Sequence, residues 1–176
     1  MTDANHTLIL GGVRSGKSRL AEQRAANSCL EVIYVATAQA LDDTEMRARI
    51  DTHRARRLEN WTTIEAPIRL ADTLRAHCAP DRCVLVDCLT LWLTNLLCAN
   101  DAGLLAVQCD ALLTALPTLP GRIILVSNET GLGVVPMGAL TRRYVDAAGE
   151  LHQRLAEVCS NVIMTVAGLP MVLKGQ

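Results

Sequence analysis

The chain of 176 residues contains no phenylalanine, and aromatic residues make up only 2% of it. This scarcity already limits the classes of function that we expect. Proteins that bind nucleic acids carry basic patches and often stack aromatic side chains on bases. The formal net charge here is −1. The composition therefore excludes nucleic acid as an expected partner, and the core must be built from Leu, Val, Ile, Ala and Cys.

Long hydrophobic runs are also missing. The sequence has no uninterrupted apolar span of the roughly 18 residues that a transmembrane helix requires, and its N-terminus lacks the basic and then apolar pattern of a signal peptide. Half of the residues are nevertheless hydrophobic, which is enough for a sizeable core. We therefore expect a cytoplasmic globular protein without a membrane span. The absence of repeats and linkers favours one domain over residues 1–176.

The chain holds seven cysteines but lacks closely spaced cysteine pairs. The number is odd and no C-x-x-C pair occurs, which disfavours a disulfide framework and a zinc site. Free cysteine packs as a small hydrophobic residue. We therefore predict buried, reduced thiols at Cys29, Cys78, Cys83, Cys88, Cys98, Cys109 and Cys159.

Lysine is scarce as well, since Lys17 and Lys174 are the only two in a chain rich in arginine. Lys17 belongs to residues 11–18, which read G-x-x-x-x-G-K-S and follow the apolar run 7–10. A buried strand, a glycine-rich turn and a helix in this order are typical of a P-loop, whose backbone N–H groups and helix dipole cradle phosphate. The pattern predicts nucleoside-triphosphate binding, with Lys17 at the β- and γ-phosphates and the Ser18 hydroxyl on Mg²⁺.

Apolar runs alternate with helical patterns along the whole chain. Nearly continuous apolar runs suit parallel strands that are covered on both faces. They occupy residues 7–10, 31–36, 83–88, 122–127 and 161–166, with shorter strands expected at 61–65 and 171–174. Helices are expected at 18–27, 44–60, 68–77, 90–99, 104–116 and 139–158. The alternation and the P-loop predict an α/β fold, a P-loop NTPase-like three-layer sandwich with a mostly parallel sheet.

Three further segments allow two interpretations each. The strand that ends at Asp87 has the form of a Walker B element, whose carboxylate positions Mg²⁺, but an ordinary strand-end acid has the same pattern. The helix at 90–99 is apolar almost all round, so it lies either in the core or at a subunit contact. Residues 127–138 are glycine-rich and follow a strand, where α/β folds bind ligands. They form either an acceptor-substrate loop or an ordinary connection.

The segment 46–57 is basic and contains a single histidine, His53. Helical spacing places Arg49 and Arg57 one turn on either side of it. One interpretation is a solvated basic helix face. The other is a phosphate-handling face, because nearby positive charge disfavours imidazolium and keeps His53 neutral and nucleophilic near pH 7. The arginines would then neutralise a phosphoryl group under attack.

Together these motifs resemble one family along essentially the whole chain. The segments that carry the resemblance are, in order, G-G-V-R-S-G-K-S, Y-V-A-T-A-Q-A-L-D-D, E-M-R-A-R-I-D-T-H-R-A-R-R, W-T-T-I-E, V-D-C-L-T-L-W-L-T-N-L-L and S-N-E-T-G-L-G-V-V-P. Many families share the P-loop, whereas its combination with R-I-D-T-H-R and S-N-E-T-G-L-G-V-V-P is much more specific. The chain resembles the bifunctional adenosylcobinamide kinase / adenosylcobinamide-phosphate guanylyltransferases of cobalamin biosynthesis.

The resemblance implies two reactions. A nucleoside triphosphate, ATP or GTP, phosphorylates the aminopropanol hydroxyl of adenosylcobinamide. GTP then transfers GMP to adenosylcobinamide phosphate through a guanylyl-histidine, a role that falls on His53. Some members carry two adjacent histidines there, whereas this chain has Thr52 before His53. The resemblance also implies a homotrimer and a mixed, mainly parallel sheet.

The site residues follow from the motifs and the resemblance together. His53 and Lys17 are the expected catalytic residues, and Ser18 and Asp87 are the expected Mg²⁺ ligands. Nucleotide binding is assigned to Gly11, Gly12, Val13, Arg14, Ser15, Gly16, Lys17, Ser18, Thr37, Ala38, Gln39, Arg54, Ala55, Arg56, Arg57, Glu65 and Asp87.

Other functions stay open from the residues alone. A different small-molecule P-loop kinase would leave His53 a bystander. A nucleotide-dependent regulatory switch would normally carry N-K-x-D, which a chain with lysine only at 17 and 174 cannot contain. The residues do not decide whether Asp87 or Glu129 deprotonates the acceptor hydroxyl. We expect surface or structural roles for the other histidines, which are His6, His77 and His152.

Overall fold

The computed structural model describes residues 5–39, 60–99 and 101–175 of the chain. Within them, a seven-stranded sheet has the order β3-β2-β4-β5-β1-β6-β7. The strands are β1 Thr7–Gly11, β2 Glu31–Ala36, β3 Thr62–Glu65, β4 Arg82–Asp87, β5 Arg122–Asn128, β6 Asn161–Val166 and β7 Leu169–Lys174. Every pairing is parallel except that of β6 with β7. The sheet is therefore mixed and mostly parallel, as predicted.

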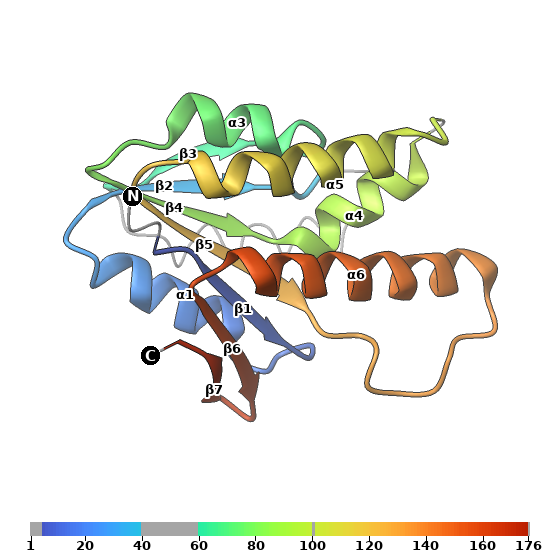
Figure 1. Cartoon of the computed structure of the whole chain (residues 1–176). Helices are drawn as coiled ribbons and strands as arrows, with labels where there is room; N and C mark the ends of the chain where they lie inside the picture. The colour runs from blue at the N-terminus through green and yellow to red at the C-terminus, as the bar shows by residue number, and fades with distance from the viewer. Residues whose placement is uncertain (1–4, 40–59, 100, 176) are drawn as a thin grey trace.

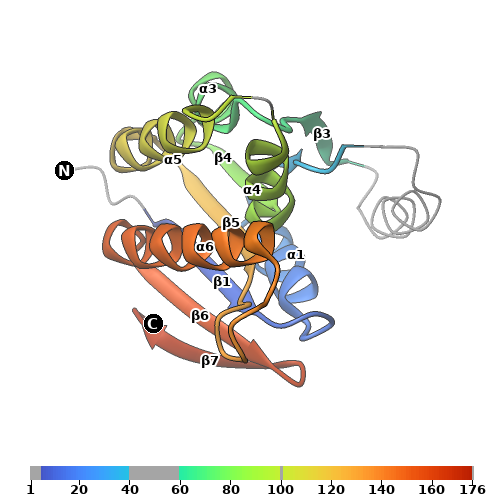
Figure 2. The ribbon, with the colours of Figure 1, turned by 90° about the vertical axis from the view of Figure 1, so that its right-hand side faces the viewer.

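Helices cover both faces of this sheet (Figures 1 and 2). They are α1 Lys17–Ala26, α3 Leu70–His77, α4 Leu89–Cys98, α5 Leu104–Ala115 and α6 Ala139–Val158, with a short 3-10 turn at Leu116–Thr118. Helix α1 packs Ala21 and Ala25 on one face, in a cluster that contains Ile9. Helices α3 to α6 pack on the other face, in a cluster that contains Leu8 and Leu10. Successive residues of β1 thus point to opposite layers, which gives the three-layer sandwich.

The structure places α4 in the core. Leu89, Trp92, Leu93 and Leu96 are buried within the single chain. The indole N–H of Trp92 donates to the carbonyl oxygen of Ile68 at 2.7 Å, so this large side chain is buried without an unpaired donor. Of the two interpretations of this apolar helix, the core position is confirmed.

The predicted elements agree with the observed ones to within one or two residues at most ends, as is usual at helix and strand termini. The helix predicted at 44–60 falls almost entirely outside the described residues. All seven cysteines are free, and the prediction of buried thiols is confirmed for Cys83 and Cys159. Cys78, Cys88 and Cys109 are half-buried, and the prediction is wrong for Cys29 and Cys98, which are exposed. Cys98 is the last residue of α4, and Cys29 lies in the turn after α1 with a φ of +58°, so neither position is covered by a neighbouring layer.

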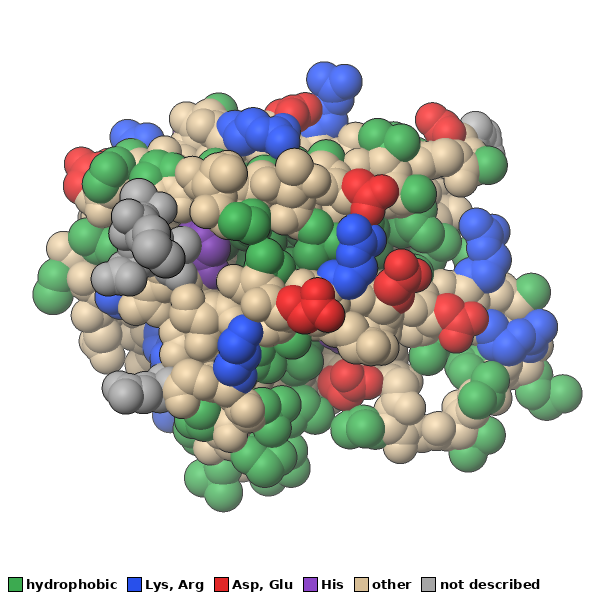
Figure 3. Space-filling model, in the orientation of Figure 1, with side chains coloured by type: hydrophobic (Ala, Val, Ile, Leu, Met, Phe, Trp, Pro, Cys, Tyr) green, Lys and Arg blue, Asp and Glu red, His purple; other side chains and the backbone are tan. Residues whose placement is uncertain are grey.

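The edge strand β7 is exposed along its whole length. Apolar side chains gather there, and we call Val166, Leu169, Met171, Val172 and Leu173, which are 50–71% exposed, the β7 face. Figure 3 shows hydrophobic side chains gathered over β6 and β7. Exposed apolar edges favour association with another chain. Within the described residues, no helix combines the length and apolar character needed to cross a bilayer.

Candidate active site

Parallel pairing brings the predicted functional segments to one edge of the sheet. Gly11 at the end of β1 is in register with Asn128 of β5 and Thr165 of β6. Asp87 at the end of β4 is in register with Ala36 of β2. Open α/β sheets bind ligands at this carboxyl edge. The P-loop and the proposed Walker B acid therefore share the edge, with only β5 between their strands.

The turn between β1 and α1 is held in place by β6 and the residues after it. Ser15 Oγ lies 2.8 Å from Thr165 Oγ1, and the N–H of Gly168 donates to the carbonyl oxygen of Ser15 at 2.9 Å. A methyl group on Gly11 would collide with the hydroxyls of Ser15 and Thr165. Gly16 precedes α1 with a φ of +97°, a left-handed conformation that favours glycine. Local geometry thus requires glycine at both ends of this turn.

Lys17 is the first residue of α1, and its side chain reaches back across the turn. Its Nζ donates to the carbonyl oxygen of Gly12 at 3.1 Å, and the residue is only 9% exposed. Burial lowers the pKa of Lys17, whereas the negative charge of the nearby Asp87 raises it. A buried cation at the first turn of a helix, over a glycine-rich turn, is suited to binding phosphate.

Tyr34 orients Asp87 from the face of the sheet that α1 covers. The hydroxyl of Tyr34 donates to Asp87 Oδ2 at 2.9 Å, and Tyr34 stacks on Trp61 with ring centroids 6.4 Å apart. Tyr34 belongs to the core cluster under α1. The Asp87 carboxylate, the Tyr34 hydroxyl and the Lys17 ammonium thus form one group on the α1 side of the carboxyl edge.

A second polar cluster lies at the end of β5, on the side of α6. His152 Nε2 is 2.8 Å from Ser127 Oγ, and His152 Nδ1 is 3.8 Å from Glu129 Oε2. Burial lowers the pKa of His152, whereas the charge of Glu129 raises it. The backbone N–H of Glu129 donates to the carbonyl oxygen of Gly11 at 3.0 Å. This cluster therefore adjoins the start of the P-loop.

A serine, a histidine and an acid in this order also occur in nucleophilic hydrolases. Ser127 is fully buried, however, so no substrate carbonyl can reach its hydroxyl. Its contact holds the ring of His152 in place. Glu129 differs, because 22% of its side chain is exposed. Of these three residues, the acid is the one positioned to meet a ligand.

Comparison with known sequences decides the family. A sequence family described as cobinamide kinase / cobinamide phosphate guanyltransferase matches residues 7–173 of the chain. The chain belongs to this family. It is 64% identical over 169 residues to the bifunctional adenosylcobalamin biosynthesis protein CobP of Pseudomonas aeruginosa, covering 96% of this chain and 97% of that protein. It is 37% identical over 182 residues to the bifunctional adenosylcobalamin biosynthesis protein CobU of Escherichia coli, covering 95% and 98%.

Family membership confirms the expected enzyme class, a bifunctional cobinamide kinase and cobinamide-phosphate guanylyltransferase of adenosylcobalamin biosynthesis. Solved structures confirm the P-loop NTPase fold. An ATPase of a bacterial type III secretion system aligns with a TM-score of 0.56 at 11% identity, over 91% of this chain and 50% of that one. The RadB recombinase aligns with a TM-score of 0.50 at 18% identity, over 93% and 74%.

The structure brings together some of the nucleotide-binding residues expected for this family. Residues 11–18 and Asp87 share the α1 side of the edge, as described above. Thr37 is fully buried, and its hydroxyl donates to the carbonyl oxygen of Cys88 at 2.6 Å, which ties the end of β2 to the residue after Asp87. Beyond it, Ala38 is half-buried and Gln39 is exposed.

Glu65 is not brought to the P-loop within the described chain. It is an exposed residue at the end of β3, and β2, β4 and β5 lie between its strand and β1. His53, Arg54, Ala55, Arg56 and Arg57 fall outside the described residues.

His152 was expected to be a surface or structural residue, and the structure buries it beside Glu129, a candidate ligand-binding acid. The S-N-E run at the end of a predicted strand points to the acid, and no signal in the sequence places His152 beside it.

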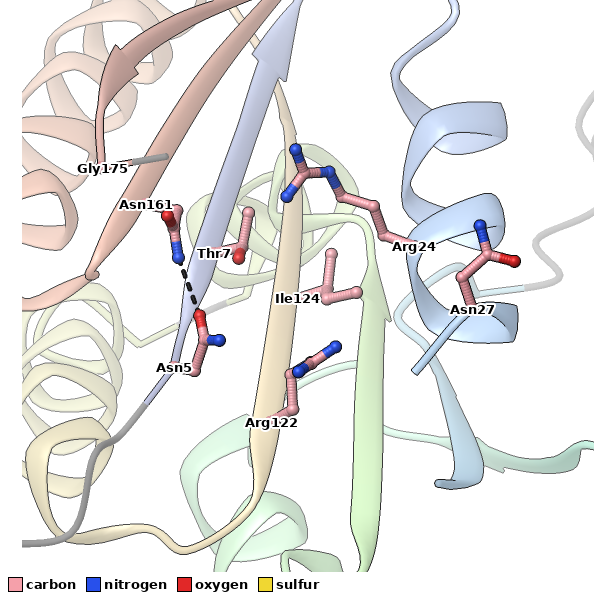
Figure 4. A pocket seen from close by; sticks show the side chains of 8 residues that line it. All are labelled: Asn5, Thr7, Arg24, Asn27, Arg122, Ile124, Asn161 and Gly175. Atoms are coloured by element: carbon pink, nitrogen blue, oxygen red, sulfur yellow. Dashed lines mark hydrogen bonds between the residues drawn. The ribbon is translucent and has the colours of Figure 1, made fainter. Parts of the chain in front are cut away.

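A cavity of about 510 Å³ lies elsewhere, between the amino ends of the strands and the end of α1. Figure 4 shows Arg24 of α1 and Arg122 of β5 lining it, with Asn5 hydrogen-bonded to Asn161 at 2.8 Å. The cavity is at the opposite edge of the sheet from residues 11–18. The candidate active site is therefore the carboxyl edge at the P-loop, which we call the P-loop edge, because it combines the glycine-rich turn with Lys17 and Asp87.

Proposed function

We propose that the P-loop edge binds the nucleoside triphosphate for both family reactions, the phosphorylation of adenosylcobinamide and the guanylyl transfer to its phosphate. The observation that carries this proposal is the buried Lys17 at the first turn of α1, whose Nζ reaches back over the glycine-rich turn to Gly12 O at 3.1 Å. The backbone N–H groups of residues 12–17 surround the phosphates, and Lys17 neutralises charge at the β- and γ-phosphates. ATP or GTP serves as the phosphate donor.

Mg²⁺ fits this site through the Ser18 hydroxyl and the Asp87 carboxylate. Magnesium prefers oxygen ligands and is usually held by one or two carboxylates together with substrate phosphates. Among the residues that the structure describes, no group of three or more His, Cys, Asp or Glu could hold a metal ion by itself. Tyr34 orients the carboxylate of Asp87 toward this use. When bound, Mg²⁺ would neutralise the charge that develops on the phosphates.

The acceptor is adenosylcobinamide, and we assign its binding to the segment that follows β5. Leu132, Val134, Val135 and Met137 project from this segment with 72–96% of each residue exposed. The segment starts at Glu129, which is hydrogen-bonded to the first glycine of the P-loop. Exposed apolar side chains next to a phosphate site suit a large substrate that must bring one hydroxyl to the γ-phosphate.

For guanylyl transfer, we assign the nucleophile to His53. Its imidazole attacks the α-phosphorus of GTP, pyrophosphate leaves, and the GMP then passes to a phosphate oxygen of adenosylcobinamide phosphate, which frees the imidazole. A covalent intermediate divides one difficult exchange into two displacements. Arg54, Arg56 and Arg57 favour the neutral imidazole and offset phosphate charge. Family membership and this chemistry support the assignment.

We further propose a cytoplasmic homo-oligomer, a trimer as the family resemblance implies, without a nucleic-acid partner. The β7 face supports association between copies, because an exposed apolar edge strand is otherwise costly in water. The near-neutral net charge of −1 gives no general attraction to nucleic acid.

GTP labelled at the α-phosphate tests the reaction scheme. We expect the wild-type protein to retain covalent label that is labile in acid and stable in alkali, as a phosphoramidate is. His53→Ala should abolish the label without weakening nucleotide binding, which is measured separately by titration. His77→Ala is the matched control, because His77 ends α3, away from the carboxyl edge, and should keep the label.

The outcomes separate the rival functions. Label that survives His53→Ala would rule out this nucleophile. Wild-type protein that phosphorylates cobinamide but never takes up label would be a kinase alone, and hydrolysis of GTP without either product would favour a regulatory switch.

A further inference from the structure

The two family reactions differ in whether the acceptor must lose a proton. In phosphorylation the acceptor is an alcohol, whose oxygen attacks well only as its proton departs. In guanylyl transfer the acceptor is a phosphate monoester, which is already ionised above about pH 6. A general base at this edge is therefore needed for the first reaction and not for the second. The following inference rests on the proposed pair of reactions.

Asp87 is poorly placed for such a role. Its carboxylate accepts the Tyr34 hydroxyl and lies near the Lys17 ammonium on the α1 side of the edge. A carboxylate that is already engaged by a hydroxyl and lies near a cation is suited to the metal and the phosphates.

Glu129 has different contacts. Its Oε1 accepts the N–H of Gly131 at 2.6 Å, and its Oε2 lies 3.8 Å from His152 Nδ1. In the described part of the chain, no lysine or arginine forms an ion pair with Glu129. Burial lowers the pKa of His152 and raises the pKa of Tyr144 to about 12, so both neighbours favour their neutral forms. The Glu129 carboxylate therefore has neutral neighbours there.

The position of Glu129 meets the second requirement, which is access to both reactants. Its backbone N–H is bonded to Gly11 O at 3.0 Å, so the residue adjoins the triphosphate site. It also begins the segment whose exposed apolar side chains we assign to the acceptor. Its side chain is 22% exposed, whereas Ser127 and His152 are buried.

We propose that Glu129 is the general base of the phosphorylation reaction and that His152 and Ser127 are positioning residues for it. The O–H bond of the acceptor breaks, and its proton passes to the Glu129 carboxylate. The alcohol oxygen forms a bond to the γ-phosphorus while the bond from that phosphorus to the bridging oxygen breaks. The nucleoside diphosphate leaves with the electron pair, and Glu129 later returns its proton to water.

Glu129→Gln tests the proposal sharply, because the amide oxygen can still accept the N–H of Gly131 while the basic group is gone. Two assays are run on each purified variant. One measures phosphorylation of cobinamide with γ-labelled triphosphate, and the other measures guanylyl transfer from GTP to cobinamide phosphate supplied ready-made. We expect kcat for phosphorylation to fall by about 100-fold or more, with KM for the triphosphate unchanged and guanylyl transfer within about threefold of wild type.

Two further variants complete the set. His152→Gln should lower kcat of phosphorylation by roughly tenfold and leave its KM values and guanylyl transfer unchanged, as expected of a residue that acts through Glu129. Glu157→Gln is the matched control, since Glu157 is exposed near the far end of α6 and should leave both rates as they are.

The results discriminate clearly. A parallel fall of both reactions in Glu129→Gln, together with a lower melting temperature, would assign Glu129 to loop structure and overturn the proposal. A rise in KM for cobinamide at unchanged kcat would assign it to binding and overturn the proposal equally. Phosphorylation by the wild-type protein tests the proposed function separately, since it does not depend on how the variants behave.

Discussion

Asp87 and Glu129 stand at the same edge of the sheet in opposite surroundings. Asp87 lies on the α1 side, bonded to the Tyr34 hydroxyl and beside the buried Lys17. Glu129 lies on the α6 side, near His152, whose pKa burial lowers. A carboxylate near a cation and a hydroxyl donor is suited to holding a metal with phosphates, whereas a partly exposed carboxylate beside a buried imidazole is open to a substrate hydroxyl.

The difference suggests how one P-loop can serve two reactions. The two sides lie on opposite faces of the sheet, and the backbone bond from Glu129 to Gly11 joins them at its carboxyl edge. On this view both reactions need the α1 side, because both use a triphosphate. Only phosphorylation needs the α6 side. Variants on each side should therefore fail in different patterns.

Loss of Lys17 should have the largest effect. We expect Lys17→Ala to lower both phosphorylation and guanylyl transfer by about 100- to 1,000-fold, the usual cost of removing one group that stabilises charge in the transition state. Steady-state rates of the two reactions measure it. Full guanylylation in this variant would contradict a shared triphosphate site.

The chain offers one matched control, because Lys174 is its only other lysine. Lys174 Nζ donates to the carbonyl oxygens of Ala156 and Glu157 at the end of α6. Lys174→Ala should therefore cost less than about 1 kcal/mol of stability and leave both rates unchanged.

Gly11→Ala should produce the next largest effect. The new methyl group would meet Ser15 and Thr165, so the turn must shift. We expect a loss of about 1–3 kcal/mol in the free energy of unfolding and a nucleotide affinity at least tenfold weaker. Urea unfolding and nucleotide titration measure these quantities. Gly149→Ala in α6, where a methyl group meets nothing within 4 Å, should instead gain up to about 1 kcal/mol; equal stability of the two variants would refute the packing argument.

The fold was predictable because its signals are local. Apolar runs marked the strands of the described chain, and the glycines of the P-loop marked its turn. Some side-chain environments were not predictable. Cys98 belongs to an apolar helix, yet its side of α4 is not covered by another layer. Burial of a particular side chain depends on which elements neighbour it, and that depends on strand order.

The site, too, contains residues that the sequence predicts and one that it does not. Lys17 and Asp87 are visible in sequence because each follows an apolar strand in a known pattern. His152 lies 25 positions from Ser127 in the chain, and only the packing of α6 on β5 brings them together. No spacing rule links a helix residue to a strand-end serine across that distance. The acid of this cluster could be suspected from the sequence, and its partner could not.

The smallest expected effects come from removing single hydroxyl groups, and they test whether the α1 side and the α6 side serve different reactions. Tyr34→Phe removes one hydroxyl bonded to Asp87, and Ser127→Ala removes one bonded to His152. A hydrogen bond of this kind contributes about 1 kcal/mol, or roughly fivefold in rate if it is fully expressed in the transition state. We expect Tyr34→Phe to slow both reactions to a similar extent. Ser127→Ala should slow phosphorylation alone, measured as kcat with each acceptor. If Ser127→Ala slowed guanylyl transfer equally, the α6 side would serve the whole site, and the distinction between Asp87 and Glu129 would be one of position and not of chemistry.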